Sequence, residues 1–78
     1  FNKGSLRTIK PFHTTGLCFT NRIILGLVIS GNLEVQTSLS VNHFISDEEF
    51  LLPANLHFQV SAGVLGAVIF FARQKFKK

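Results

Sequence analysis

Two stretches of the sequence are rich in apolar residues, and the second is the longer. Residues 54–72, ANLHFQVSAGVLGAVIFFA, contain no formally charged side chain. As a helix, these residues would extend about 28 Å at ~1.5 Å per residue, close to the ~30 Å hydrocarbon core of a bilayer. The pattern predicts a transmembrane helix over 54–72, and Pro53 suits the first turn of such a helix.

The first apolar segment, residues 23–33, reads IILGLVISGNL. Alone it is too short to span a bilayer, because about 20 apolar residues are needed. Extension back to about residue 16 gives a longer span that includes Arg22, whose side chain would reach toward the interface. We therefore weigh two structures for this segment: a second span, which makes the protein a two-helix hairpin, and a buried or re-entrant segment.

Other parts of the chain alternate between apolar and polar residues, which is the pattern of a β-strand. Residues 33–42, LEVQTSLSVN, alternate well, with Leu33, Val35, Leu39 and Val41 on one side, and residues 56–64 also alternate. The rest of the second apolar stretch does not alternate, and its length favours a helix. Between the two apolar stretches, Ser46 and Glu49 match a helix capping box, which predicts a short interfacial turn over 46–52.

The charges are strongly segregated along the chain. All eight Lys and Arg residues lie at or before Arg22 or at or after Arg73, and all four acidic residues lie between them. Under the positive-inside rule both basic ends would stay on one side of a membrane and the acidic loop would cross it. The tail would fix this orientation and contact anionic lipid through Arg73, Lys75, Lys77 and Lys78.

Together these patterns predict a small α-helical membrane protein with a C-terminal transmembrane helix and, in the hairpin form, an acidic loop. Only 15% of the 78 residues are charged, against about 25% in a typical globular domain. The predicted segments are a basic N-terminal arm (1–22), the first apolar segment (23–33), an acidic connecting loop (34–53), the transmembrane helix (54–72) and a basic tail (73–78).

Pairs of small residues four positions apart are the clearest interaction pattern. Such pairs let two helix backbones approach closely in lipid. We therefore predict helix packing through the following residues: Ala62 with Gly66, Gly63 with Ala67, and Gly26 with Ser30.

Few residues suggest chemistry. His57 lies about one turn inside the predicted helix, where an imidazole would ligate chlorophyll or another pigment, or bond to a headgroup or partner carbonyl. Cys18 has no catalytic partner in the sequence, and we expect no catalytic site and no metal site. The basic tail directly follows an apolar stretch, which favours lipid over nucleic acid as its partner.

The predicted architecture resembles the small, one- or two-span accessory subunits of organellar energy-transducing complexes. The acid-free composition of residues 1–21 is also typical of organellar targeting segments. This resemblance implies a non-catalytic accessory subunit of a photosystem or the respiratory chain, in the thylakoid or mitochondrial inner membrane. Its partners would be larger membrane-protein subunits and membrane lipids.

Two alternative functions use the same residues differently. The first is a pigment-binding small membrane subunit that uses His57. The second is a soluble β-rich interaction module built from the alternating residues 33–42 and 56–64.

Overall fold

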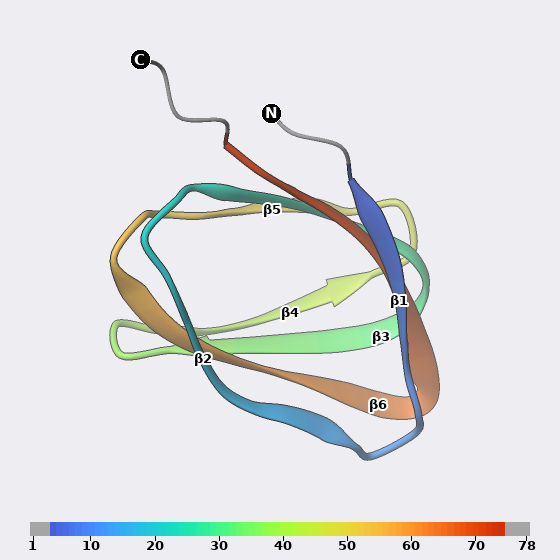
Figure 1. Ribbon diagram of the computed structural model, residues 1–78. Coiled ribbons are helices and arrows are strands. Elements are labelled where there is room, and N and C mark those ends of the chain that lie inside the picture. The colour runs from blue at the N-terminus through green and yellow to red at the C-terminus, as the bar shows by residue number, and fades with distance from the viewer. Residues whose placement is uncertain (1–3, 75–78) are drawn as a thin grey trace.

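Six strands and no helix make up the described part of the chain. The computed structural model describes residues 4–74, and every regular element within them is a β-strand (Figure 1). In chain order the strands are β1 Ser5–Ile9, β2 Thr14–Thr20, β3 Ile24–Thr37, β4 Val41–Ile45, β5 Glu49–Leu52 and β6 Leu56–Arg73. Every strand pairing is antiparallel.

Two long strands, β3 and β6, form the centre of the fold. They pair along almost their whole length, from Ile24 opposite Arg73 to Thr37 opposite Phe58. The pairing shifts twice near the middle of β3, between positions 28 and 30 and between positions 31 and 33. Such bulges bend a strand and increase its twist. The long pair therefore passes from one layer of the structure into a second.

Each half of the long pair is flanked by two shorter strands. In sheet I the order is β1–β6–β3–β5, with the C-terminal half of β6 beside the N-terminal half of β3. In sheet II the order is β2–β6–β3–β4, with the other halves of the two long strands. Figure 1 shows the strands wrapped around a common interior, which both sheets face.

The side-chain pattern of β3 explains how one strand serves both layers. In its first half Ile24 and Val28 are buried, whereas in its second half Leu33 and Val35 are buried. The inward positions thus change from even to odd numbers across the bulges. Because side chains alternate between the two faces of a strand, one extra residue is what keeps apolar side chains inward on both sides of the bend.

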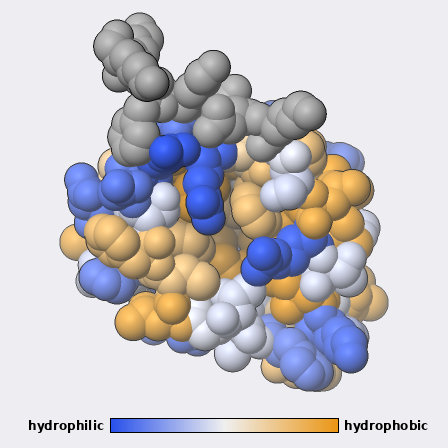
Figure 2. Space-filling model, viewed as in Figure 1, coloured by the Kyte–Doolittle hydropathy of each residue, from blue (hydrophilic) through white to orange (hydrophobic). Residues whose placement is uncertain are grey.

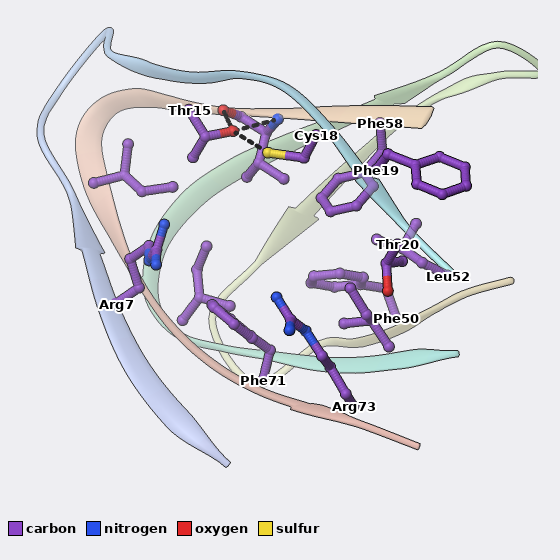
Figure 3. A pocket seen from close by; sticks show the side chains of 14 residues that line it. Arg7, Thr15, Cys18, Phe19, Thr20, Phe50, Leu52, Phe58, Phe71 and Arg73 are labelled. Carbon is purple, nitrogen blue, oxygen red and sulfur yellow. Dashed lines mark hydrogen bonds between the residues drawn. The ribbon is translucent and has the colours of Figure 1, made fainter. Parts of the chain in front are cut away.

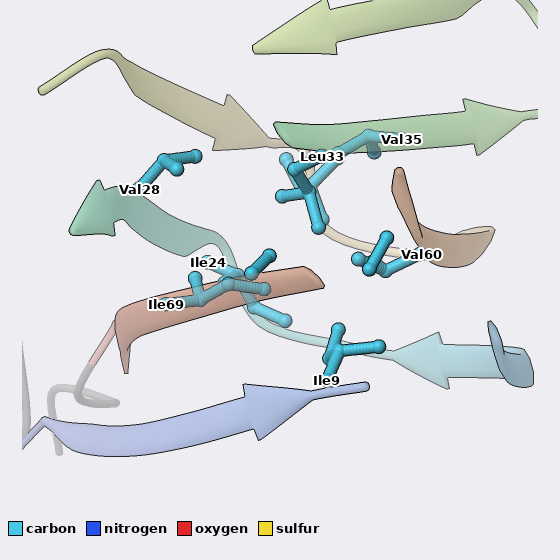
Figure 4. Packing of buried hydrophobic residues seen from close by; sticks show 10 residues of the cluster. Ile9, Ile24, Val28, Leu33, Val35, Val60 and Ile69 are labelled. Atoms are coloured by element: carbon cyan, nitrogen blue, oxygen red, sulfur yellow. The ribbon is translucent and has the colours of Figure 1, made fainter. Parts of the chain in front are cut away.

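The core lies between the two sheets and draws on both halves of the long strands. Val28, Leu33 and Val35 are the largest fully buried side chains. Ile9 of β1 and Val60 and Ile69 of β6 pack in the same cluster (Figure 4). Burial of such side chains stabilises a fold by about 1.5–3 kcal/mol each.

The transmembrane helix predicted over 54–72 is wrong, because these residues form strand β6. Within residues 4–74 the structure has no helix with the length and hydropathy of a membrane span. The first apolar segment, 23–33, lies in strand β3, so the predicted helical hairpin is also wrong. The accessory-subunit function and the location in an organellar membrane were predicted from these helices. Both predictions are therefore wrong as well.

The capping box predicted at Ser46 and Glu49 does not form a helix start. Residues 46–48 make a tight turn in which Asp47 has a positive φ of 71°, and Glu49 begins strand β5. The Glu48 carboxylate accepts a hydrogen bond from the backbone N–H of Ile45 at 2.7 Å. The acidic segment therefore closes a connection between two short strands.

Both alternating segments lie in strands. Residues 33–37 belong to β3, residues 41 and 42 to β4, and residues 56–64 to β6. The structure thus favours the β-rich interaction module, which the sequence offered only as an alternative.

Two glycines face each other where the long strands bend. Gly31 has a φ of 90° and Gly66 has a φ of 71°, conformations that L side chains rarely adopt. A Cβ atom on Gly31 would collide with the Gly66 carbonyl oxygen. The close crossing of β3 and β6 therefore requires glycine at position 31.

We expect Gly31→Ala to lower the free energy of unfolding by about 2–5 kcal/mol, because it combines left-handed strain with overpacking. Gly16→Ala is the matched control, since Gly16 has a φ of 77° but no atom within 4 Å of an added Cβ. The control should cost only about 1–2 kcal/mol. Urea unfolding followed by circular dichroism measures both values, and equal losses would show that steric crowding at the bend is unimportant.

Candidate functional site

A cavity of about 130 Å³ lies in the interior between the two sheets. Its walls are mostly apolar, and the inward-facing rings of Phe50, Phe58 and Phe71 form part of them (Figure 3). Each ring comes from a different part of the sheet: β5, the first half of β6 and the second half of β6. Phe50 also stacks on Phe44, with 5.0 Å between ring centroids. The cavity is thus a product of the folded-over sheet.

Two arginines border this cavity. Arg7 lies opposite Ile69 in the β1–β6 ladder, and Arg73 lies opposite Ile24 in the β3–β6 ladder. Ile69 and Ile24 are core residues, so both arginines occupy inward-facing positions. Figure 3 shows both guanidinium groups turned toward the cavity rather than away from it. Both residues remain exposed to solvent, which places them at the mouth.

An aromatic ring supports one of the two guanidinium groups. The Cζ atom of Arg7 lies 5.6 Å from the centroid of the Phe71 ring, within the range of a cation–π interaction. Neither Arg7 nor Arg73 forms an ion pair with an acidic residue in the described part of the chain. The donors of both side chains therefore remain available to a ligand.

The acidic residues lie away from the cavity. The Glu34 carboxylate contacts His43 Nε2 at 2.9 Å, an exposed pair that joins β3 to β4. Asp47 and Glu48 lie in the turn before β5. Residues 4–74 contain no group of three or more His, Cys, Asp or Glu side chains that would hold a metal ion.

Apart from the two arginines at the mouth, the polar part of the cavity wall comes from β2. The Cys18 thiol lies 3.8 Å from Thr15 Oγ1 and 3.6 Å from the carbonyl oxygen of Gly16 (Figure 3). Thr15 Oγ1 accepts a hydrogen bond from the backbone N–H of Val60 at 3.3 Å. These contacts tie the irregular start of β2 to β6 and define one wall of the cavity.

The outer face of sheet I is a second notable surface. Phe70 lies in register between Leu6 and Leu27, and Leu25 lies next to Leu51. Leu6 is 67% exposed and Leu51 is 59% exposed. Sheet I is therefore apolar on its outer face as well as on its core face.

Sheet II has a different outer face. Its two central strands place Gln36 opposite Gln59 and Glu34 opposite Ser61. Exposed apolar side chains occur there on the edge strands, at Leu17, Phe19, Val41 and Ile45. Figure 2 shows hydrophobic side chains gathered in patches between hydrophilic ones, with a recess near the middle of the view.

The small residues that were predicted to pack helices against each other lie in strands β3 and β6 instead. Ala62 and Ala67 are buried in the core of β6. Gly66 stands at the bend, and an added Cβ on Gly63 would lie 3.0 Å from the Asn32 side chain. In β3, Gly26 lies under the Phe50 ring and Ser30 pairs with Val68. Because the strand period is two, residues four apart do not form a helical stripe here.

The remaining predicted site residues are dispersed. His57 is exposed on β6, and its ring lies 4.7 Å from that of Phe19. His57 lies on a strand and not on the predicted helix, and a pigment at this residue stays a prediction. Arg73 lies at the cavity mouth. Lys75, Lys77 and Lys78 lie outside the described residues.

Arg7, Phe71 and the apolar outer face of sheet I were not predicted from the sequence. Arg7 was counted only as a charge in a basic arm, and Ser5–Ile9 does not alternate, because Leu6 is exposed and Ile9 is buried. Phe71 follows Phe70, and this pair hides the alternation because one ring faces in and the other out. The sequence of β1 therefore carries no periodic signal that turns Arg7 inward.

Comparison with known proteins identifies the fold. No protein-family model matches the sequence, and no curated protein matches it. The cupin domain of Cnp3 from Schizosaccharomyces pombe superposes with a TM-score of 0.85 at 11% identity, covering 94% of this chain and 52% of that one. This chain therefore spans about half the length of that domain structure.

Two further solved structures have the same fold. A protein of unknown function from Rhizobium leguminosarum gives a TM-score of 0.85 at 14% identity, covering 94% of this chain and 69% of that one. Drosophila melanogaster CENP-C bound to CAL1 gives 0.78 at 13% identity, covering 91% and 63%. At these identities the similarity shows the fold alone: the described chain is a cupin-like β domain.

We expect Arg7→Gln to lower the free energy of unfolding by less than about 1 kcal/mol, because an exposed cation–π contact is weak. Phe71→Ala should cost about 3 kcal/mol, because the ring packs against the core. Chemical denaturation of both variants measures the difference. A loss for Arg7→Gln as large as that for Phe71→Ala would make Arg7 a structural residue rather than a ligand-binding one.

Proposed function

We propose that this chain is a non-catalytic, β-rich interaction module that pairs with a second copy of itself through the outer face of sheet I. The observation that carries the proposal is that sheet I is apolar on both faces. An antiparallel sheet with one face in water normally alternates apolar and polar residues. Sheet I breaks this rule at the centre of its outer face, where Leu25, Leu27 and Phe70 lie together.

The cost of leaving this face in water supports a partner. Exposed apolar surface costs about 25 cal/mol per Å², and large contiguous apolar patches mark interaction sites. Leu6, Phe70 and Leu27 form one row across three neighbouring strands. Leu51 extends the apolar face to the edge strand β5. An apolar sheet face of this kind packs on another sheet about 10 Å away, as in a β-sandwich.

The distribution of charge favours a second copy as the partner. Strands β1, β6 and β3 contribute no charged residue to this face, and the one acid, Glu49, lies on the edge strand β5, at the end of the row that contains Leu27. Two copies related by a two-fold axis would therefore bring no like charges together at the centre of the interface. A strongly charged partner would find no complementary group there.

One structural neighbour supports a protein as the partner. The Drosophila CENP-C structure contains that cupin-like protein bound to another protein, CAL1. For the present chain this supports association with protein rather than with a membrane subunit. The positions of the potentially reactive groups support a non-catalytic role, because Glu34 pairs with His43 outside the cavity and the Cys18 thiol is held by Thr15 and Gly16.

The test is the molar mass of the full chain in solution, measured by sedimentation equilibrium. We expect the mass of two chains for the unmodified protein. Phe70→Glu should raise the dissociation constant by at least about 100-fold, because it buries an unpaired carboxylate at the centre of the interface. Leu6→Glu, at a more exposed position on an edge strand, should weaken the dimer without disturbing the fold.

Gln36→Glu is the matched control, since it adds the same charge to a central strand of sheet II. This variant should retain the mass of two chains. A monomeric unmodified protein would overturn the proposal. A different protein would then be the candidate partner for the outer face of sheet I. Equal weakening by Gln36→Glu and Phe70→Glu would also contradict it, because net charge rather than sheet I would then control assembly.

A further inference from the structure

We infer that the interior cavity binds a small organic carboxylate whose apolar body is about the size of a benzene ring. This site uses the inner faces of the two sheets, whereas the proposed dimer uses the outer face of sheet I. Each proposal can therefore be tested and rejected independently of the other. The inference combines the size of the cavity, its wall and the two arginines at its mouth.

The volume of the cavity sets the size of the ligand. The cavity holds about 130 Å³. An apolar protein cavity of about 150 Å³ is known to admit benzene. A single six-membered ring, or a branched aliphatic group of similar size, therefore fits the present space with its polar end at the opening.

The wall determines the chemistry of the buried end. Ile24, Val60 and Ile69 line the cavity together with the rings of Phe50 and Phe71. These side chains offer dispersion contacts and no hydrogen bonds. The hydroxyl groups of Thr15 and Thr20 on the β2 side of the wall already bond to the backbone of Val60 and Arg22. A polar group placed among the apolar side chains would therefore lose its hydration without compensation. The inner end of the ligand must be apolar, and aromatic edges and faces on the wall suit another ring.

The mouth determines the chemistry of the other end. Arg7 and Arg73 approach from different strands, and neither is neutralised by an acid in the described part of the chain. A guanidinium group recognises a carboxylate through two parallel N–H···O hydrogen bonds. The Phe71 ring, 5.6 Å from Arg7 Cζ, restricts that guanidinium group to the mouth and lowers the cost of ordering it.

The positions of the two arginines argue against a purely solvated role. Lys10, next to the buried Ile9, stays outside the cavity wall although it is on the same segment of chain. Arg7 and Arg73 instead occupy positions where the alternation of the strand turns the side chain inward. An apolar interior with paired positive charge at its opening is the arrangement that an amphipathic anion requires.

The test is a titration of the isotopically labelled full chain with benzoate, followed by two-dimensional NMR. We expect saturable shifts at Ile24, Val60 and Phe71, with a dissociation constant in the millimolar range or below, as befits so small a ligand. Benzyl alcohol keeps the ring and loses the charge, and acetate keeps the charge and loses the ring. Each should bind at least about 10-fold more weakly than benzoate.

Charge-matched variants separate the site from general electrostatic attraction. Arg7→Gln and Arg73→Gln should each weaken benzoate binding by about 10-fold or more. Lys10→Gln removes the same charge away from the cavity and should leave the affinity unchanged. Spectra of the unliganded variants establish that each is folded.

Three results would overturn the inference. The first is the absence of saturable shifts in the unmodified protein. The second is equal affinity for benzoate and benzyl alcohol, which would show that the cavity recognises the ring but not the carboxylate. The third is equal weakening by Lys10→Gln and Arg7→Gln, which would mean that benzoate responds only to the net positive charge. The oligomeric state of the protein does not enter any of these results.

Discussion

The bent pairing of β3 with β6 is the constraint on which the rest of the structure depends. These two strands supply the centre of both sheets, and every other strand pairs with one of them. The bend requires that their backbones cross closely, with Gly31 against the Gly66 carbonyl group. A side chain at position 31 would separate the strands and open the angle between the sheets. The two register shifts and the close approach of Gly31 to Gly66 therefore set the relation between the two layers.

The bend also creates the interior surface. Each long strand changes the parity of its inward positions at the bulges, so that Val28 and Leu33 both reach the core although they are five residues apart. The same change brings Phe58 and Phe71 of β6 to the wall of one cavity. Aromatic side chains from two distant stretches of one strand thus line the same cavity. The candidate ligand site is a consequence of folding a single sheet over onto itself.

The two apolar surfaces of sheet I explain why its strands resemble membrane helices in sequence. A strand buried on one face alternates, but a strand that is apolar on both faces shows a continuous apolar run. Residues 64–72 are such a run, since Phe70 faces out and Phe71 faces in. Its length and its basic continuation fit a transmembrane helix equally well. Periodicity cannot separate the two structures when neither face is polar.

The sequence by itself determined where apolar and polar residues alternate, and the alternating residues 33–37 and 56–64 do lie in strands. The same sequence nevertheless favoured a connecting loop over 34–53 and a transmembrane helix over 54–72. It also determined that the acidic residues cluster in the middle of the chain and the basic residues at its ends. Only the tertiary structure decided that residues 64–72 are extended, because the pairing partners of this segment, β1 and β3, lie more than thirty residues earlier in the chain. Tertiary structure likewise turned Arg7 and Arg73 toward one cavity. Their positions at opposite ends of the sequence give no sign that they line one cavity, and it is the ladders of β6 with β1 and β3 that place both there.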